Sequence, residues 1–149
     1  FALPMSSFSK GASEQVPMQA AGVAIGNAIC YEIIYPALVA KRAADSGVIV
    51  TVSNDTWFGA SIGPHQHLQM ARLRALENGR YVVRATSNGI TAIITPRGEL
   101  VDRAPQFETT YLTGEFYAME GLTPFTRMGS LPIWLLAGLF LLPGFVRRR

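Results

Sequence analysis

The stretch VAIGNAICYEIIYPALVAKRAADSGVIVTVS, residues 23–53, decides the fold of this chain. Apolar and small side chains alternate over residues 23–30, a pattern typical of a half-buried strand. Residues 35–46 predict a helix, because Pro36 suits a first helical turn. The β-branched run at residues 48–53 predicts a strand buried on both faces. Strand, helix and strand together form a βαβ unit, which indicates an α/β fold.

Further elements are expected on both sides of this unit. Residues 64–78 predict a second helix, which Gly79 ends. Turn-forming residues then separate short apolar runs that predict four strands, at residues 81–86, 90–95, 98–102 and 110–116. The whole chain therefore predicts a mixed α/β sheet with antiparallel strands at its edge, covered by helices. Residues 1–22 are expected to form a loop that remains from an upstream part of the same domain.

Composition excludes several kinds of protein. The chain has 149 residues, enough for one domain, and its one cysteine rules out an internal disulfide framework. Its 13 Lys and Arg residues and 10 Asp and Glu residues give a net charge of +3. The terminal arginines at 147–149 account for those three charges, so the rest of the chain sums to zero. Without a basic face to neutralise phosphates, nucleic-acid binding is not expected.

Residues 128–146 contain no charged side chain. As a helix they would extend about 28 Å, close to the thickness of a bilayer's hydrocarbon core. Trp134 would lie at one membrane interface, and residues 147–149 would form a basic cytoplasmic anchor at the other. We therefore predict a transmembrane helix, with the preceding domain on the non-cytoplasmic side. A buried hairpin helix is the alternative, and the Pro143-Gly144 pair gives it some support.

Cys30 lies where the first strand is expected to pass into a helix. A thiol at such an elbow projects from the end of a sheet, and a following helix N-terminus favours the reactive thiolate. The loop at residues 54–59 follows the next parallel strand, so it should lie at the same edge, where ligand sites of such sheets are found. The alternative is that Cys30 is an inert, buried side chain.

Four motifs in order along the chain carry a resemblance to a known family. They are NAICYE at residues 27–32, SNDTWFG at 53–59, the stretch from His67 to Arg80, and RATSNGIT at 84–91. Together they resemble the carbon–nitrogen hydrolase (nitrilase) superfamily. With TPFTR at residues 123–127 and the apolar segment that follows, the resemblance narrows to the branch that N-acylates apolipoproteins. It covers nearly the whole chain.

The resemblance implies part of an α-β-β-α sandwich, with residues 23–127 as the C-terminal part of a catalytic domain on the periplasmic side of a bacterial inner membrane. It places Cys30 at the nucleophile of a Glu-Lys-Cys triad. Such an enzyme takes an acyl chain from a phospholipid as a cysteine thioester and passes it to the N-terminal amine of a diacylglyceryl-cysteine apolipoprotein. It implies neither a cofactor nor a metal.

The chain departs from the family pattern upstream of Cys30. The triad's glutamate and lysine belong to strand ends and loops, and neither Lys10 nor Glu14 lies in such a context. We therefore assign neither role, and we expect residues 1–149 to lack activity alone, as part of a longer polypeptide. Two alternatives remain open: an amidase of the same superfamily, and a membrane-tethered binding domain without enzymatic activity.

Some neighbours of Cys30 have candidate supporting roles. The resemblance makes Tyr31 and Glu32 supporting residues, although simple turn chemistry is the alternative. A carboxylate disfavours a thiolate beside it, so Glu32 must be paired with a cation if Cys30 is to react. Trp57 and Phe58 are candidates for binding an acyl chain, or they fill the core.

The remaining polar motifs predict structural roles. His65 and His67 would point about 200° apart on the predicted helix, since each residue turns by about 100°, so a shared metal site is not expected. The arginines in this part of the chain are expected to be solvated or structural, with one pairing with Glu77 or Glu32. They are Arg72, Arg74, Arg80 and Arg84.

Overall fold

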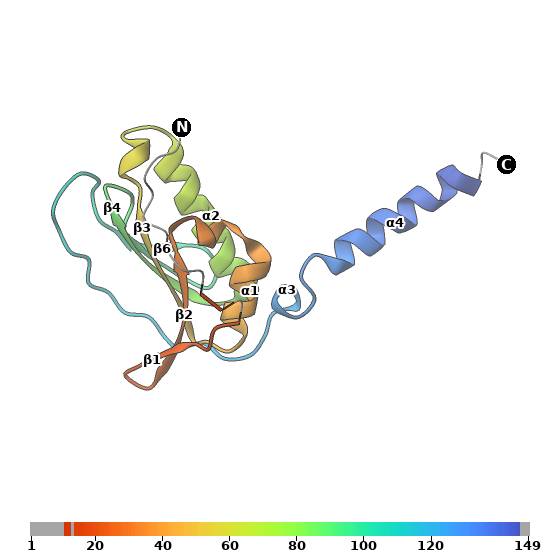
Figure 1. The fold of residues 1–149 in the computed structure, drawn as a ribbon, viewed down its shortest axis with the longest axis horizontal. Helices are drawn as coiled ribbons and strands as arrows, with labels where there is room; N and C mark the ends of the chain where they lie inside the picture. Colours follow the sequence, from red (N-terminus) through yellow and green to blue (C-terminus); the bar gives the residue numbers. More distant parts are fainter. Residues whose placement is uncertain (1–10, 13, 147–149) are drawn as a thin grey trace.

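A computed structural model describes residues 11–12 and 14–146, with side chains as far as residue 141. A six-stranded mixed sheet forms the body of the molecule, and its strands lie side by side in the order of the sequence (Figure 1). The three central strands are parallel: β2 (Val23–Ile29), β3 (Val48–Asn54) and β4 (Tyr81–Ser87). The outer strands run antiparallel to their neighbours: β1 (Met18–Ala20), β5 (Ala92–Ile94) and β6 (Leu100–Arg103). The predicted mixed α/β sheet is confirmed.

Two helices cover one face of the sheet, α1 (Pro36–Ala44) and α2 (Gly63–Asn78) (Figure 1). Helix α1 approaches strand β2 closely at Gly26, which has no side chain. A Cβ added there would meet Ser46 Oγ at 2.7 Å and Arg42 O at 2.9 Å. The core between helices and sheet is apolar and almost fully buried. Its members include Ala28, Ile33, Val39, Ala43, Ile49, Leu68, Ala71, Ala75, Val82 and Ile94.

Residues 104–121 run along the other side of the sheet (Figure 1). The strand predicted at 110–116 is wrong, because this segment crosses the face of the sheet instead of pairing along an edge. Gly114 lies against the Ile93 side chain, and the rings of Phe116 and Tyr117 lie 6.5 and 6.2 Å from that of Tyr81. The segment is therefore held against the sheet by side-chain contacts, and it forms no ladder of backbone hydrogen bonds with a strand.

The rest of that face remains open at its carboxyl edge. Ile29 and Val52 lie there with 59% and 50% of their surface exposed. Within the described residues, one helical layer and one sheet account for the fold, which is half of the four layers that an α-β-β-α sandwich contains. The nitrilase-like architecture is therefore seen in part.

Both ends of the chain differ from expectation. Strand β1 forms within residues 1–22, which were expected to be a loop, and Met18 pairs with Ile25 of β2. At the other end, a short helix α3 (Pro124–Met128) stops at Gly129, whose φ of 56° and ψ of −138° are not helical. The apolar helix α4 (Leu131–Val146) therefore has 16 residues and begins later than predicted.

Helix α4 extends away from the sheet (Figure 1). Its large apolar side chains are exposed, among them Trp134 at 73% and Phe140 at 80%. In the part of the chain that the structure describes, no helix is both long enough and apolar enough to cross a bilayer. The predicted transmembrane helix over residues 128–146 is thus not found here, and the arginines at 147–149 lie outside the described residues.

Arg80 ties three segments together at the end of the sheet opposite Cys30. Its Nε donates to Ser46 O, just before β3, and its Nη2 donates to Gly121 O, just before α3, each at 2.6 Å. Burial lowers the pKa of the Arg80 guanidinium, since the charged form is desolvated. Arg80 is therefore a structural residue, as predicted.

The substitution Arg80→Met should lower the free energy of unfolding by about 3 kcal/mol, because two carbonyl groups lose charged donors in a buried place. Chemical denaturation of the full-length gene product measures the loss. Arg97→Met, at an exposed arginine, serves as the matched control and should change the free energy by less than about 0.5 kcal/mol. Equal losses in the two variants would contradict the structural role of Arg80.

Candidate active site

Cys30 lies at the carboxyl edge of the parallel strands. Strand β2 ends at Ile29, and Cys30 begins a short 3-10 helix, η1 (Cys30–Ile34). Its Sγ lies 3.5 Å from the Oγ of Ser53, near the end of β3. The prediction that Cys30 and the loop after the second parallel strand share one edge is confirmed. That loop contains a second 3-10 helix, η2 (Thr56–Phe58).

The backbone of Cys30 has a φ of 53°, in the left-handed region that residues other than glycine rarely adopt. Such a conformation persists only where the surroundings hold it. One contact comes from Glu32, whose Oε2 accepts a hydrogen bond of 2.8 Å from Ile29 N. The side chain of Glu32 therefore folds back across the elbow and bridges the residues on either side of it.

Arg42 of α1 fixes that glutamate in place. Its Nη1 donates to Glu32 Oε2 at 2.6 Å and to Asn27 O at 2.7 Å. The hydrogen bond from Arg42 lowers the pKa of Glu32, although partial burial opposes the effect. The cation that Glu32 requires is therefore Arg42, which the sequence analysis did not name.

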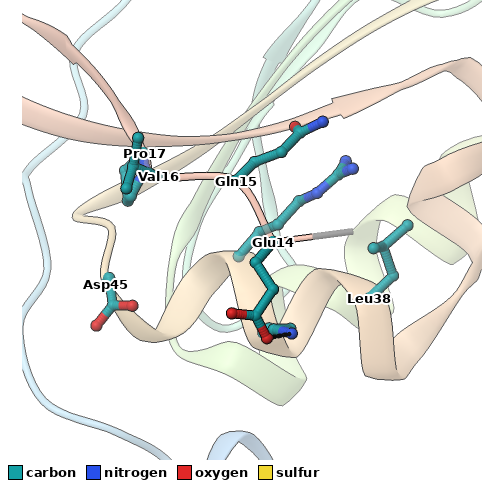
Figure 2. Close-up of a pocket in the computed structure, with 8 residues that line it drawn as sticks. Glu14, Gln15, Val16, Pro17, Leu38 and Asp45 are labelled. Carbon is teal, nitrogen blue, oxygen red and sulfur yellow. Dashed lines mark hydrogen bonds and ion pairs between the residues drawn. The ribbon is translucent and has the colours of Figure 1, made fainter. Parts of the chain in front are cut away.

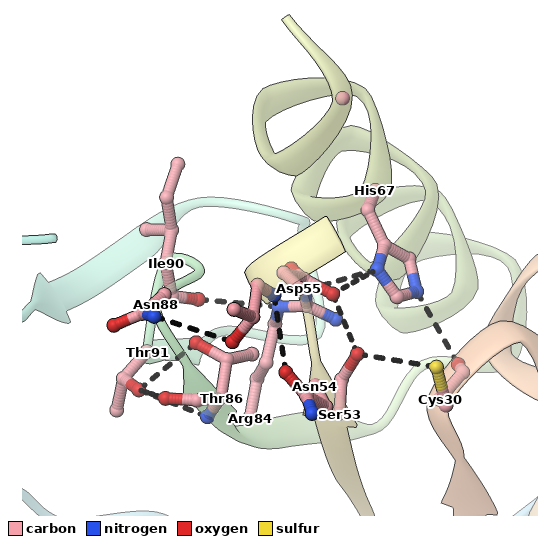
Figure 3. Close-up of polar contacts among 12 residues, drawn as sticks. Cys30, Ser53, Asn54, Asp55, His67, Arg84, Thr86, Asn88, Ile90 and Thr91 are labelled. Carbon is pink, nitrogen blue, oxygen red and sulfur yellow. Dashed lines mark hydrogen bonds and ion pairs between the residues drawn. The ribbon is translucent and has the colours of Figure 1, made fainter. Parts of the chain in front are cut away.

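A buried carboxylate, Asp55, connects the site to the rest of the sheet (Figure 3). Ser53 Oγ donates to its Oδ1 and Arg84 Nη2 donates to its Oδ2, each at 2.6 Å. His67 Nδ1 lies 3.0 Å from the same Oδ1. Asp55 is fully buried, so each of these contacts compensates the loss of water around its charge.

Arg84 supplies the positive charge of this cluster. Burial lowers the pKa of the Arg84 guanidinium, and Asp55 offsets part of that effect. Its Nε also donates to Ile90 O at 3.1 Å. The arginine that pairs with Glu77, as predicted for one of the four, is Arg74, at 3.0 Å.

His67 and His65 face different surroundings on α2. His67 is buried, and its Nε2 lies 3.3 Å from the carbonyl oxygen of Cys30. His65 is exposed. Among the described residues, no group of three His, Cys, Asp or Glu side chains is arranged to hold a metal ion.

An open, mostly apolar pocket of about 490 Å³ lies above Cys30. Trp57 and Phe58 line it together with Tyr31, and a smaller pocket beside it shares Tyr31, Phe58 and His67. Trp57 is 89% exposed, so it lies outside the core between the helices and the sheet. The site therefore combines a thiol with apolar walls, and two of its lining residues, Ser53 and His67, contact the buried Asp55.

Glu14 takes part in a separate surface pocket beside α1 (Figure 2). Its Oε1 accepts a hydrogen bond of 2.6 Å from Lys41 Nζ, and this contact lowers the pKa of Glu14. Because its carboxylate is bonded to Lys41, Glu14 is poorly suited to take a proton from Cys30. Lys10 lies outside the described residues.

Sequence reasoning missed the cluster of Ser53, Asp55, His67 and Arg84 beneath Cys30, although each lies within a motif quoted above. One signal was available: Arg84 interrupts the apolar run of β4, and a charge at such a position calls for a buried partner. Asp55 directly follows the buried strand β3 and was the natural candidate.

The sequence profile of the carbon-nitrogen hydrolase family matches residues 3–120. The chain belongs to that family. Over all of its 149 residues it is 51% identical to the apolipoprotein N-acyltransferase of Pseudomonas paraeruginosa, of which it covers 29%. Over the same residues it is 50% identical to that of Azotobacter vinelandii, again covering 29%. The chain thus spans less than a third of the length of these relatives.

Solved structures of this family share the fold. The carbon-nitrogen hydrolase of Helicobacter pylori aligns with a TM-score of 0.59 and 14% identity, over 66% of this chain and 42% of that one. A Nesterenkonia amidase, in which acrylamide has added to the active site cysteine, aligns with a TM-score of 0.50 and 21% identity. That alignment covers 65% of this chain and 41% of the amidase. At these identities the likeness concerns the fold alone.

The Glu32 to Arg42 pair should make stability depend on pH. The pKa of Glu32 is lowered from 4.5 in the folded state, so its stabilising effect is complete above about pH 4.5 and is lost as the pH falls through the lower value. The difference in unfolding free energy between wild type and Glu32→Gln should therefore shrink below pH 4.5. With Arg42→Met in both proteins this pH dependence should weaken strongly, because only the hydrogen bond from Ile29 N still favours the ionised carboxylate, and its undiminished persistence would contradict this account.

The substitution Asp55→Asn should destabilise the protein by about 3–5 kcal/mol, because it leaves the buried Arg84 charge without its counterion. Asp45→Asn, at an exposed aspartate, is the control and should cost less than about 0.5 kcal/mol. Thermal denaturation compares the variants. The double variant Asp55→Asn/Arg84→Met should recover part of the loss, and a double variant no more stable than Asp55→Asn would argue against the ion pair.

Proposed function

We propose that this chain is part of an enzyme that transfers an acyl chain from a phospholipid, through a thioester on Cys30, to the N-terminal amine of a diacylglyceryl-cysteine apolipoprotein. The observation that carries the proposal is its 51% identity, along the whole chain, to an apolipoprotein N-acyltransferase. Membership of the carbon-nitrogen hydrolase family and the position of Cys30 at an apolar pocket support it.

In the first step, Cys30 Sγ attacks the ester carbonyl of the phospholipid, and its proton passes to a general base. The oxygen leaves with the lysophospholipid and takes up a proton, which leaves the acyl chain on sulfur. In the second step, the amine of the apolipoprotein attacks the thioester carbonyl, and Cys30 regains its thiol. The family resemblance assigns the role of base to a glutamate and the oxyanion contact to a lysine. We assign these roles to neither Glu14 nor Lys10.

The walls of the pocket suit an acyl chain. Trp57, Phe58 and Tyr31 present apolar surface beside Cys30, and Val52 and Ile29 continue that surface along the sheet edge. An exposed apolar area at a pocket mouth favours contact with a hydrophobic ligand. We therefore assign Trp57 and Phe58 to substrate binding, and Tyr31 and Glu32 to support of the nucleophile.

The proposal places the protein at the bacterial inner membrane. Helix α4 exposes apolar side chains along its described length, and contact with lipid would remove that surface from water. We infer that α4 contacts the lipid and that the catalytic domain lies at the periplasmic face of the inner membrane. The phospholipid donor and the lipid-modified acceptor would then both lie within reach of the site.

A labelled acyl donor tests the first step. Full-length gene product incubated with a phospholipid carrying a labelled acyl chain should acquire a label that neutral hydroxylamine removes, as expected of a thioester. Cys30→Ala should reduce the label to background, whereas Gln69→Ala, at an exposed position on α2, should retain it. Equal labelling of wild type and Cys30→Ala would refute the mechanism.

The same preparation separates acyl transfer from amidase activity. Hydrolysis of short amides that depends on Cys30, without any labelling by the phospholipid, would identify an amidase of the same family. Transfer of the label from the isolated acyl-enzyme to a diacylglyceryl-cysteine peptide would complete the proposed reaction. Failure of that transfer, with the thioester formed, would refute the assigned acceptor.

A further inference from the structure

His67 is a buried side chain that the proposed mechanism does not use. It lies near the start of α2, and its ring fits between Asp55 and the elbow at Cys30 (Figure 3). Nδ1 lies 3.0 Å from Asp55 Oδ1 and 3.2 Å from Arg84 Nη2. Nε2 lies 3.3 Å from Cys30 O. The ring therefore contacts the buried ion pair on one side and the backbone of the nucleophile on the other.

The donors around the ring can be matched to acceptors. Arg84 Nη2 carries two hydrogens, of which one is directed to Asp55 Oδ2 at 2.6 Å. Asp55 Oδ1 can only accept, so the hydrogen bond at 3.0 Å requires a hydrogen on His67 Nδ1. Cys30 O can likewise only accept, so its contact at 3.3 Å requires a hydrogen on Nε2. A ring protonated at both nitrogens satisfies both contacts and donates from Nε2 to Cys30 O.

That carbonyl belongs to a strained residue. A φ of 53° at Cys30 is strained in a residue with a Cβ, so contacts must hold it. Glu32 holds the backbone on the N-terminal side of the elbow, at Ile29 N. His67 holds the carbonyl of Cys30 itself. One contact is made before Cys30 in the chain and the other at its own carbonyl, and together they restrict the direction of the bond from Cα to Cβ.

We propose that His67 is a positioning residue, which aims Cys30 Sγ into the apolar pocket by donating from Nε2 to the Cys30 carbonyl. The Asp55 to Arg84 ion pair orients the ring, and His67 itself exchanges no proton with the substrate. The inference rests on the proposed function in one respect, namely that Cys30 is the reacting group. Its consequence is that the loss of one ring nitrogen should matter more than the loss of the other.

Two amide variants separate the ring nitrogens. In His67→Gln the amide nitrogen takes the place of Nε2 and can still donate to Cys30 O, whereas in His67→Asn the shorter amide takes the place of Nδ1 and reaches only Asp55. His67→Leu removes both contacts. His65→Gln, at the exposed histidine two residues away, is the matched control.

Two readouts are taken on the full-length gene product in detergent: kcat and KM for acyl transfer, and the rate at which iodoacetamide alkylates Cys30. His67→Gln should keep both rates within about 3-fold of wild type. His67→Asn and His67→Leu should lower kcat and the alkylation rate by about 10- to 100-fold with little change in KM, because a small misplacement of a nucleophile costs that much. His65→Gln should match wild type.

Melting temperatures distinguish positioning from simple stability. Equal rates in His67→Gln and His67→Asn, or rates that follow the melting temperatures alone, would overturn the proposal. Alkylation does not require acyl transfer, so the two hypotheses fail separately. If wild type forms no thioester but the alkylation rates still rank Gln above Asn, the positioning role stands and the proposed function falls.

Discussion

The ion pair between Asp55 and Arg84 is the interaction on which the rest of the site depends. Both side chains are fully buried, and 2.6 Å separates their closest atoms. A lone charge in that place would be strongly unfavourable, so the end of β3, the middle of β4 and the start of α2 can adopt only an arrangement that keeps the pair together. Ser53 and His67 are bonded to that pair, and both contact Cys30. The Asp55 to Arg84 ion pair thus determines the position of the Cys30 thiol through Ser53 and His67.

The sequence predicted the centre of the fold better than its margins. Periodicity and turn residues identified the βαβ unit and the helix at residues 64–78, because those signals are local. Strand β1 carried no such signal, since it has three residues, all exposed. Residues 110–116 had the composition of a strand, but they cross the face of the sheet and pair with none of its strands. The start of α4 depended on the conformation of Gly129, which composition did not specify.

For the site, the sequence predicted where the thiol would lie but not what surrounds it. The rule that parallel strands share an end was enough to bring Cys30 to the loop after β3. The contacts of His67 and Arg84 join residues from different elements, and no local pattern encodes a distance across a sheet. Arg42 was likewise missed as the partner of Glu32, because only the packing of α1 against β2 brings it to the elbow.

The charges near the elbow also bear on the identity of the base. Glu32 is bonded to Arg42, and Asp55 is bonded to Arg84. The contact with Arg42 lowers the pKa of Glu32, which makes it a weak proton acceptor. Both oxygens of Asp55 are already engaged by Ser53, His67 and Arg84. Both carboxylates therefore serve better as supports than as the group that deprotonates Cys30. In the proposed reaction the base is a different carboxylate, which must approach the pocket from its open side, where Ile29 and Val52 lie exposed.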